Sequence, residues 1–190
     1  MISKTRKTKE TDIEISLEPY GSGKNNIDTG VGFLDHMLES FSKHSLIDLN
    51  IKCIGDTHVD DHHSVEDVGI VLGSLLCESI YPAKNIERFA SVAIVMDEAC
   101  VECDIDLSNR PFLVFDLPVR GKVGNFDSEL VEEFFRALIL NANISAHIVK
   151  KRGKNKHHII EAAFKAIGVA IRRAMIKNNK MGIPSTKDVL

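Results

Sequence analysis

One pattern, HHxxExxxxxxG, occurs twice in this chain, and no other feature constrains the fold so strongly. The two copies lie 95 positions apart, at residues 62–73 and 157–168. A repeat of this kind indicates one structural unit used twice. Each half is too small to cover its own apolar surface well, so we expect the two halves to pack together.

The sequence around each copy repeats as well. Each copy is preceded by a segment whose apolar residues recur at helical spacing, and then by a segment in which apolar and polar residues alternate as in a strand. Each half also opens with extended, alternating sequence. The expected helices are 33–44 and 129–140, and the expected strands are 13–17, 47–53, 101–107 and 144–148.

These patterns predict an α+β fold made of two similar half-domains. Each half is expected to form a small mixed or antiparallel sheet with two helices on one face, and the halves pack as one unit. The whole chain, 1–190, then forms a single domain. Its first half is 1–88, and its second half is 89–190, including a C-terminal tail at 182–190.

Composition excludes several classes of protein. The formal net charge of −3 gives no general attraction for nucleic acid, and no apolar run is long enough to cross a bilayer. The polar N-terminus lacks the apolar stretch of a signal peptide, so we expect a cytoplasmic protein. Cys100 and Cys103 lie three apart in a predicted strand and therefore on opposite faces, which favours reduced thiols.

The repeated motif predicts a metal site. On a helix, residues four apart such as His62 and Glu66 share a face, while His63 lies about 100° further round. Alignment of the two preceding helices places His36 opposite Glu133. If the halves interlock, one ion takes His157, Glu161, His63 and His36, and the other takes His62, Glu66, His158 and Glu133.

The chemistry of these ligands narrows the range of metal ions that are expected to bind. Nitrogen and oxygen donors without a thiolate disfavour a structural zinc site and suit a six-coordinate ion such as manganese or iron. Both HH pairs fall in the first turn of their helix, where the helix dipole favours the neutral imidazole that binds metal. A single HH pair is usually just a solvated helix start, but a doubled HHxxE motif favours a site.

Several basic residues are candidates for binding an anion. Lys165 lies one turn after Glu161, where it either receives an anionic group or forms a salt bridge to that glutamate. Arg88 and Arg110 are further candidates, with surface positions as the alternative. The tail is either a loose end or a flap that carries Ser185 and Lys187 to a phosphate. The basic stretch 150–156 lacks interleaved aromatic residues and favours a solvated turn.

Four segments together resemble the imidazoleglycerol-phosphate dehydratase family along nearly the whole chain. They are GFLDHML (32–38), DDHHSVED (60–67), GKNKHHIIEAAFKA (153–166) and the ending IPSTKDVL. The resemblance implies dehydration of imidazole glycerol phosphate to imidazole acetol phosphate in histidine biosynthesis. It also implies a homo-oligomeric shell of 24 subunits with active sites between subunits, so that any interlocking of ligands can be between chains.

The resemblance also implies roles for particular residues. Glu10 matches a family glutamate that reaches the substrate and acts in proton transfer. One departure is Glu133, where many family members have His, so it is either a ligand or an ordinary surface acid. Two Mn²⁺ are implied at His36, His62, His63, Glu66, His157, His158 and Glu161. Phosphate contacts are implied at Arg88, Arg110, Lys165, Ser185 and Lys187.

The implied reaction has a physical rationale, stated here as a hypothesis. Metal coordination of the substrate imidazole stabilises an imidazolate, which expels the neighbouring hydroxyl before a carbon-bound proton is lost. His63, His158 and Glu10 are the expected catalytic residues. The alternatives are a dinuclear phosphoesterase, an RNA-binding module and a passive metal-storage shell.

Overall fold

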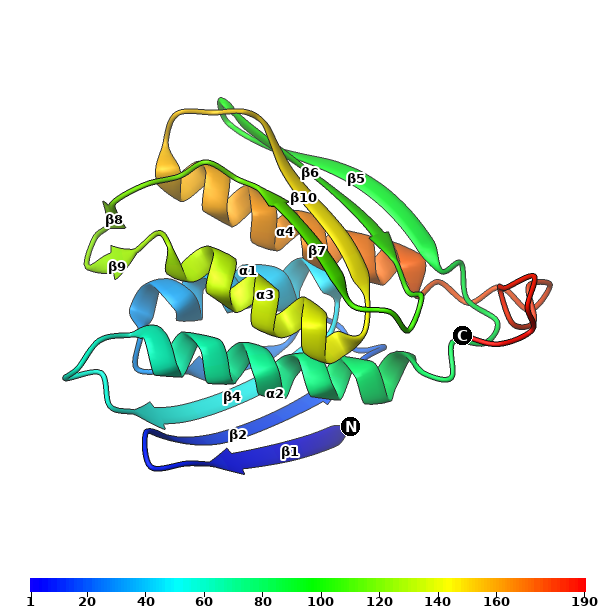
Figure 1. Ribbon diagram of the computed structural model, residues 1–190, viewed down its shortest axis with the longest axis horizontal. Helices are drawn as coiled ribbons and strands as arrows, with labels where there is room; N and C mark the ends of the chain where they lie inside the picture. The colour runs from blue at the N-terminus through cyan, green and yellow to red at the C-terminus, as the bar shows by residue number, and fades with distance from the viewer.

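The computed structural model describes all 190 residues as two four-stranded sheets with four helices between them (Figure 1). The first sheet has the order β1-β2-β4-β3 and the second has the order β5-β6-β10-β7. Each sheet combines two antiparallel pairings with one parallel pairing. The expected α+β fold of two similar halves is confirmed.

The elements follow one order in both halves, apart from a short extra hairpin in the second. The first half contains β1 (Ile2–Lys7), β2 (Thr11–Glu18), β3 (Asn25–Asp28), α1 (Gly32–Ser45), β4 (Asp48–Gly55) and α2 (His62–Ile80). The second contains β5 (Phe89–Met96), β6 (Ala99–Asp106), β7 (Phe112–Asp116), the hairpin β8 (Lys122–Val123) and β9 (Phe126–Asp127), α3 (Leu130–Ala142), β10 (Ser145–Arg152) and α4 (Lys156–Ala174).

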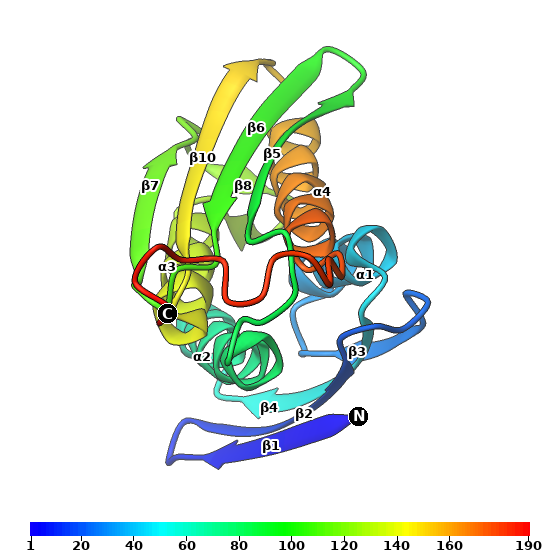
Figure 2. The same ribbon diagram turned by 90° about the vertical axis from the view of Figure 1, so that its right-hand side faces the viewer.

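The helices form the middle of the molecule and pair across the two halves. Each sheet covers the two helices of its own half, while α2 packs on α3 and α1 packs on α4 (Figure 2). The pairing is close because glycines lie at both crossings. A Cβ at Gly73 would come within 2.4 Å of the Leu138 carbonyl oxygen, and one at Gly168 within 2.9 Å of the Phe41 carbonyl oxygen.

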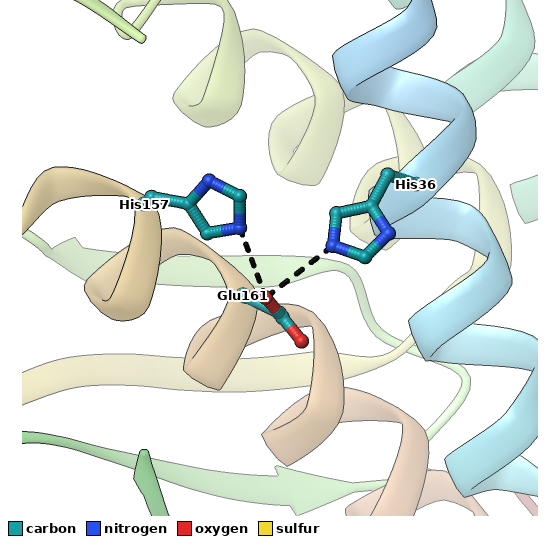
Figure 3. Close-up of side chains that lie close together, drawn as sticks. All are labelled: His36, His157 and Glu161. Carbon is teal, nitrogen blue, oxygen red and sulfur yellow. Dashed lines mark hydrogen bonds and ion pairs between the residues drawn. The ribbon is translucent and has the colours of Figure 1, made fainter. Parts of the chain in front are cut away.

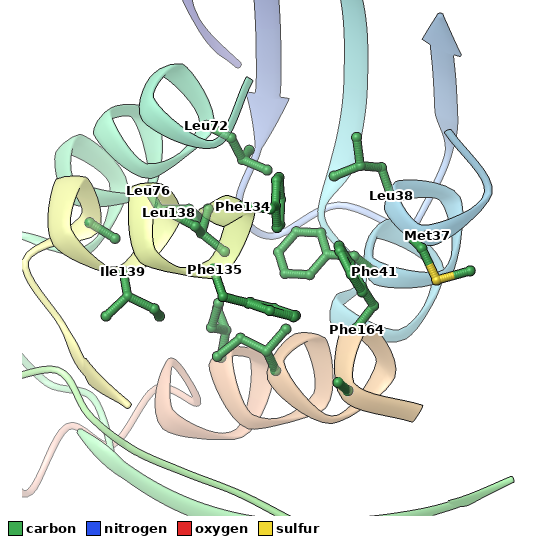
Figure 4. Packing of buried hydrophobic residues seen from close by; sticks show 14 of the residues in the cluster. Met37, Leu38, Phe41, Leu72, Leu76, Phe134, Phe135, Leu138, Ile139 and Phe164 are labelled. Carbon is green, nitrogen blue, oxygen red and sulfur yellow. The ribbon is translucent and has the colours of Figure 1, made fainter. Parts of the chain in front are cut away.

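One continuous core joins the halves, with 51 buried residues drawn from every helix and from both sheets. At its centre four phenylalanines from three helices meet (Figure 4). Phe164 of α4 stacks on Phe134 of α3 with ring centroids 5.1 Å apart, and the ring centroid of Phe135 lies 4.7 Å from that of Phe164. Phe41 of α1 lies beside them. The apolar stripes that predicted the helices therefore face one shared interior.

Strand pairing allows the repeat to be followed residue by residue. Ile15 of β2 pairs with Ile51 of β4, and Cys103 of β6 pairs with Ile148 of β10. Counterparts are thus 88 positions apart in β2 and β6, and 97 apart in β4 and β10. The second half gains nine residues between its third strand and its first helix, in the region of β8 and β9, and loses two before its HH helix.

Two further expectations can be compared with the structure. No helix has both the length and the apolar composition needed to cross a membrane. All four cysteines are free thiols, as predicted for the CxxC segment, and burial raises the pKa of the Cys103 thiol.

Candidate active site

Both HH pairs occupy the first turn of their helix. In the second half the Asn155 side chain accepts hydrogen bonds from the backbone N–H groups of His157 and His158, at 2.9 and 3.4 Å, as expected for a helix cap. In the first half Asp60 accepts a hydrogen bond from the His62 N–H at 2.8 Å. A side-chain acceptor just before each HH pair therefore satisfies a backbone N–H group at the start of each helix.

Three predicted ligands meet at the start of α4 (Figure 3). Nε2 of His157 lies 3.1 Å from Oε2 of Glu161, and Nε2 of His36 on α1 lies 3.4 Å from the same oxygen. Glu161 is 6% exposed. Two imidazole nitrogens and one carboxylate oxygen within 4.8 Å of one another form a donor set that suits a divalent ion such as manganese.

Glu161 also binds a cation of the chain itself. Nζ of Lys165 lies 2.8 Å from Oε1 of Glu161, and the Ser40 hydroxyl lies 3.3 Å from the same oxygen. Burial by itself would raise the pKa of Glu161, but Lys165 and the neighbouring imidazoles outweigh it and the pKa is lowered. The carboxylate is therefore ionised, and Lys165 lies beside the candidate metal ligands while forming the salt bridge considered as its alternative role.

The interlocked ligand sets expected within one chain are not formed. His36, His157 and Glu161 are brought together, but His63 lies apart from them. The reason is the helix pairing, in which α2 packs on α3 and α4 packs on α1. Nε2 of His62 lies 3.5 Å from Oε2 of Glu66, and these two form no three-ligand group with Glu133 or His158.

The second histidine of each pair contacts a carboxylate through Nδ1. His63 Nδ1 lies 3.0 Å from Asp56 Oδ1, and His158 Nδ1 lies 2.8 Å from Glu98 Oε2. These contacts raise the pKa of both imidazoles and lower the pKa of Glu98 to about 2. Glu10, at the β1–β2 turn, lies 3.8 Å from Nε2 of His63.

Several residues of this region were not identified from the sequence. A polar cavity of about 450 Å³ beside His36, Glu161 and the predicted Lys165 is also lined by Asn25, Glu39, Ser40, Lys43 and His44. Burial and the nearby Lys165 lower the pKa of His44. Its spacing of eight residues from His36 was a signal in the sequence, because positions i and i+8 lie on the same broad face of a helix.

Four of the five predicted phosphate-binding residues line one cavity of about 720 Å³ at the C-terminal tail. They are Arg88, Arg110, Ser185 and Lys187. The Arg88 guanidinium donates to both carboxylate oxygens of Asp106, at 2.7 and 3.0 Å, and to the Pro184 carbonyl oxygen. Arg88 therefore ties the tail to the second sheet, and the cavity is rich in cations.

The two groups of residues lie at opposite ends of α4. The Arg88 N–H donates to the carbonyl oxygen of Ala174, the last residue of that helix, whereas His157 lies in its first turn. A rise of 1.5 Å per residue separates these ends by about 25 Å. A chain's own tail cavity therefore lies far from its own metal-ligand cluster, and only Lys165 of the phosphate candidates lies near the cluster.

Comparisons with known proteins agree on one family. The profile of the imidazoleglycerol-phosphate dehydratase family matches residues 29–171. A protein named imidazoleglycerol-phosphate dehydratase from Sulfurimonas denitrificans is 73% identical over the full length of both chains. One of the same name from Wolinella succinogenes is 66% identical over 98% of each chain.

Solved structures give the same result. The imidazoleglycerol-phosphate dehydratase from Staphylococcus aureus superposes with a TM-score of 0.83 at 43% identity, covering 94% of this chain and all of that one. The enzyme from Pyrococcus furiosus superposes with a TM-score of 0.85 at 37% identity, covering 98% of this chain and all of that one.

Proposed function

The chain belongs to the imidazoleglycerol-phosphate dehydratase family of hydro-lyases, and on that premise we propose that it dehydrates imidazole glycerol phosphate with two Mn²⁺ ions in each active site. The product would be imidazole acetol phosphate, in histidine biosynthesis. The observation that carries the proposal is the convergence of His36, His157 and Glu161 on a common point, without any thiolate.

The metal ligands would come from both halves of the repeat. His36, His157 and Glu161 would hold one ion, and His62 with Glu66 would begin the set for the other. His63, His158 and Glu133 would complete the two sets. When bound, the ions would supply Lewis-acid stabilisation of negative charge on the substrate imidazole.

The chain's own residues would bind the substrate and move its protons. Arg88, Arg110, Ser185 and Lys187 would hold the phosphate, because three cations in one cavity favour a doubly charged group. That binding energy, far from the reacting carbons, would position them. Glu10 is exposed near His63, and its carboxylate would accept or return the carbon-bound proton.

We infer further that the complete site forms between subunits of a homo-oligomer, which the family resemblance suggests is a shell of 24 chains. The support is the separation of about 25 Å between the metal-ligand cluster and the tail cavity of one chain. A substrate of this size cannot bridge such a distance. The phosphate cavity that serves a metal centre must then come from another subunit.

The decisive experiment is turnover of imidazole glycerol phosphate by chelator-stripped protein before and after addition of Mn²⁺. We expect no activity in the stripped protein and recovery of the ketone product with the metal. Binding of Mn²⁺ without formation of the ketone would refute the proposed substrate but not the proposed metal site. Inorganic phosphate in place of the ketone would indicate a phosphoesterase.

A further inference from the structure

The second histidine of each HH pair is held in the same way in both halves. Asp56 contacts Nδ1 of His63 with both carboxylate oxygens, at 3.0 and 3.1 Å, and Glu98 contacts Nδ1 of His158 at 2.8 Å. Nε2 of each ring has no hydrogen-bond partner, since the acidic oxygens near it lie 3.8 Å away for His63 and 3.7 Å for His158. Each ring is therefore anchored through one nitrogen and open at the other.

We propose that Asp56 and Glu98 are positioning residues that hold His63 and His158 with the proton on Nδ1 and the lone pair of Nε2 directed outward. A neutral imidazole has one N–H and one lone pair, and a carboxylate that accepts from Nδ1–H decides which nitrogen remains free. The same contact makes that nitrogen a better metal ligand. This inference rests on the proposed metal function of the two histidines.

The two carboxylates do not come from equivalent positions of the repeat. By strand register, the counterpart of Glu10 is Glu98, since each immediately precedes the second strand of its hairpin. Asp56 follows β4, and the residue that follows β10 is Gly153. Each half thus reaches the same Nδ1 contact from a different place.

Gly153 explains why the second half needs a different acceptor for the Nδ1–H group. Its φ is +126°, and a Cβ there would lie 2.9 Å from both the Ala99 Cβ and the Ile159 Cγ1. No side chain fits at that position, so a carboxylate like that of Asp56 has no place in the second half. The hairpin residue Glu98 supplies it instead. The two halves make the same carboxylate–Nδ1 contact with residues that are not counterparts in the repeat. This argues that the contact itself has a role.

The surroundings of the two carboxylates differ in a way that can be tested. Glu98 uses both oxygens, because Oε1 accepts from the N–H groups of Lys154 and Asn155, at 3.1 and 2.8 Å, while Oε2 faces His158. The Asp56 side chain has no hydrogen-bond partner except His63. An amide can rotate to replace Asp56, but it cannot offer acceptors on both sides as Glu98 does.

This difference predicts opposite outcomes for two conservative substitutions. In E98Q the single amide oxygen is required by the backbone N–H groups, so the NH₂ group faces Nδ1 and moves the imidazole proton to Nε2. We expect Mn²⁺ affinity to fall about 10–100-fold. D56N can turn its oxygen toward His63 and should bind nearly as the wild type, whereas D56A should fall about 10–100-fold.

Mn²⁺ titration of the full-length protein by calorimetry and electron paramagnetic resonance measures these affinities. The control is E102Q, which removes the same charge from the same hairpin at a residue whose side chain pairs only with Lys151. Wild-type affinity in E98Q and D56A, with unchanged circular dichroism, would overturn the inference. A wild-type protein that binds no Mn²⁺ would instead overturn the proposed metal function.

The tautomer gives a readout that needs no metal. In ¹⁵N-histidine spectra of the metal-free protein, recorded at a pH where the imidazole is neutral, His158 should carry its proton on Nδ1 in the wild type and on Nε2 in E98Q. A wild-type His158 protonated on Nε2 alone would overturn the inference, whatever the affinities.

Discussion

His36 of α1 and Glu133 of α3 occupy equivalent positions in the two halves. The repeat glycines approach these helices at Phe41 and at Leu138, which lie 97 positions apart, as His36 and Glu133 do. His36 lies 3.4 Å from the motif glutamate of the other half. By the same relation Glu133 would face Glu66, two carboxylates that repel each other until a cation lies between them.

Replacement of Glu133 should therefore affect one of two ions. We expect E133A to bind about one Mn²⁺ tightly per chain and E133H to keep two, because imidazole can replace a carboxylate on manganese. Equilibrium dialysis with metal analysis measures the ratio. The matched control is E132A, since Glu132 pairs with Arg136 on the helix surface. Two tight ions in E133A would remove Glu133 from the ligand set.

The affinity for Mn²⁺ should fall as the pH is lowered. Hydrogen bonds to Asp56 and Glu98 raise the pKa of His63 and His158 above the usual 6.5 in the metal-free protein. A raised pKa means that the proton competes with the metal up to a higher pH, so the loss should begin above pH 6.5. Titrations between about pH 6 and 8.5 should show protons released on binding. A constant affinity across that range would contradict this.

The close helix crossings should make G73A destabilising. A Cβ there would lie 2.4 Å from the Leu138 carbonyl oxygen, and such overpacking costs about 1–3 kcal/mol, against a gain of about 1 kcal/mol in helix propensity. G168A, with 2.9 Å to the Phe41 oxygen, should lose less. G32A is the control, because nothing lies within 4 Å of its Cβ. Denaturant midpoints that rank G73A as the most stable would refute the packing argument.

Two inactive variants should complement each other if the site lies between subunits. R88A lacks a residue of the tail cavity and H157A lacks a metal ligand, yet a site built from one chain of each kind is complete. Co-refolding equal amounts should restore about a quarter of the wild-type sites. The control is a mixture assembled separately and then combined. No recovery in a co-assembled sample would show that both residues act from one chain.

The sequence was sufficient to predict the two similar halves but not to predict how they pack together. Alternating residues such as Ile13 and Ile15 predicted strands, because one face of each sheet covers the helices. β1 has only Ile2 as an apolar residue among six, so its pattern carried no signal. Which helices pack together depends on glycine crossings between distant segments. A local motif cannot indicate that α2 packs on α3.

The same limit explains which residues of the candidate site could be predicted from the sequence. His36, His157 and Glu161 were predicted together because their spacing on helices is local or repeated. Glu98 reaches His158 across 60 positions through a hairpin turn, which no spacing rule predicts. The distance between Arg88 and His157 became visible only once the length of α4 was fixed between them.

All four helices run in the same direction, so the molecule has two unlike ends (Figure 1). The HH turns lie at one end and the tail cavity lies at the other. A building block with unlike ends behaves as a directional one. In the proposed assembly, an open fragment would leave an unpaired metal-binding end and an unpaired phosphate-binding end, whereas a closed shell would leave none. Closure of the shell would then set how many of the protein's sites are active, in addition to its stability.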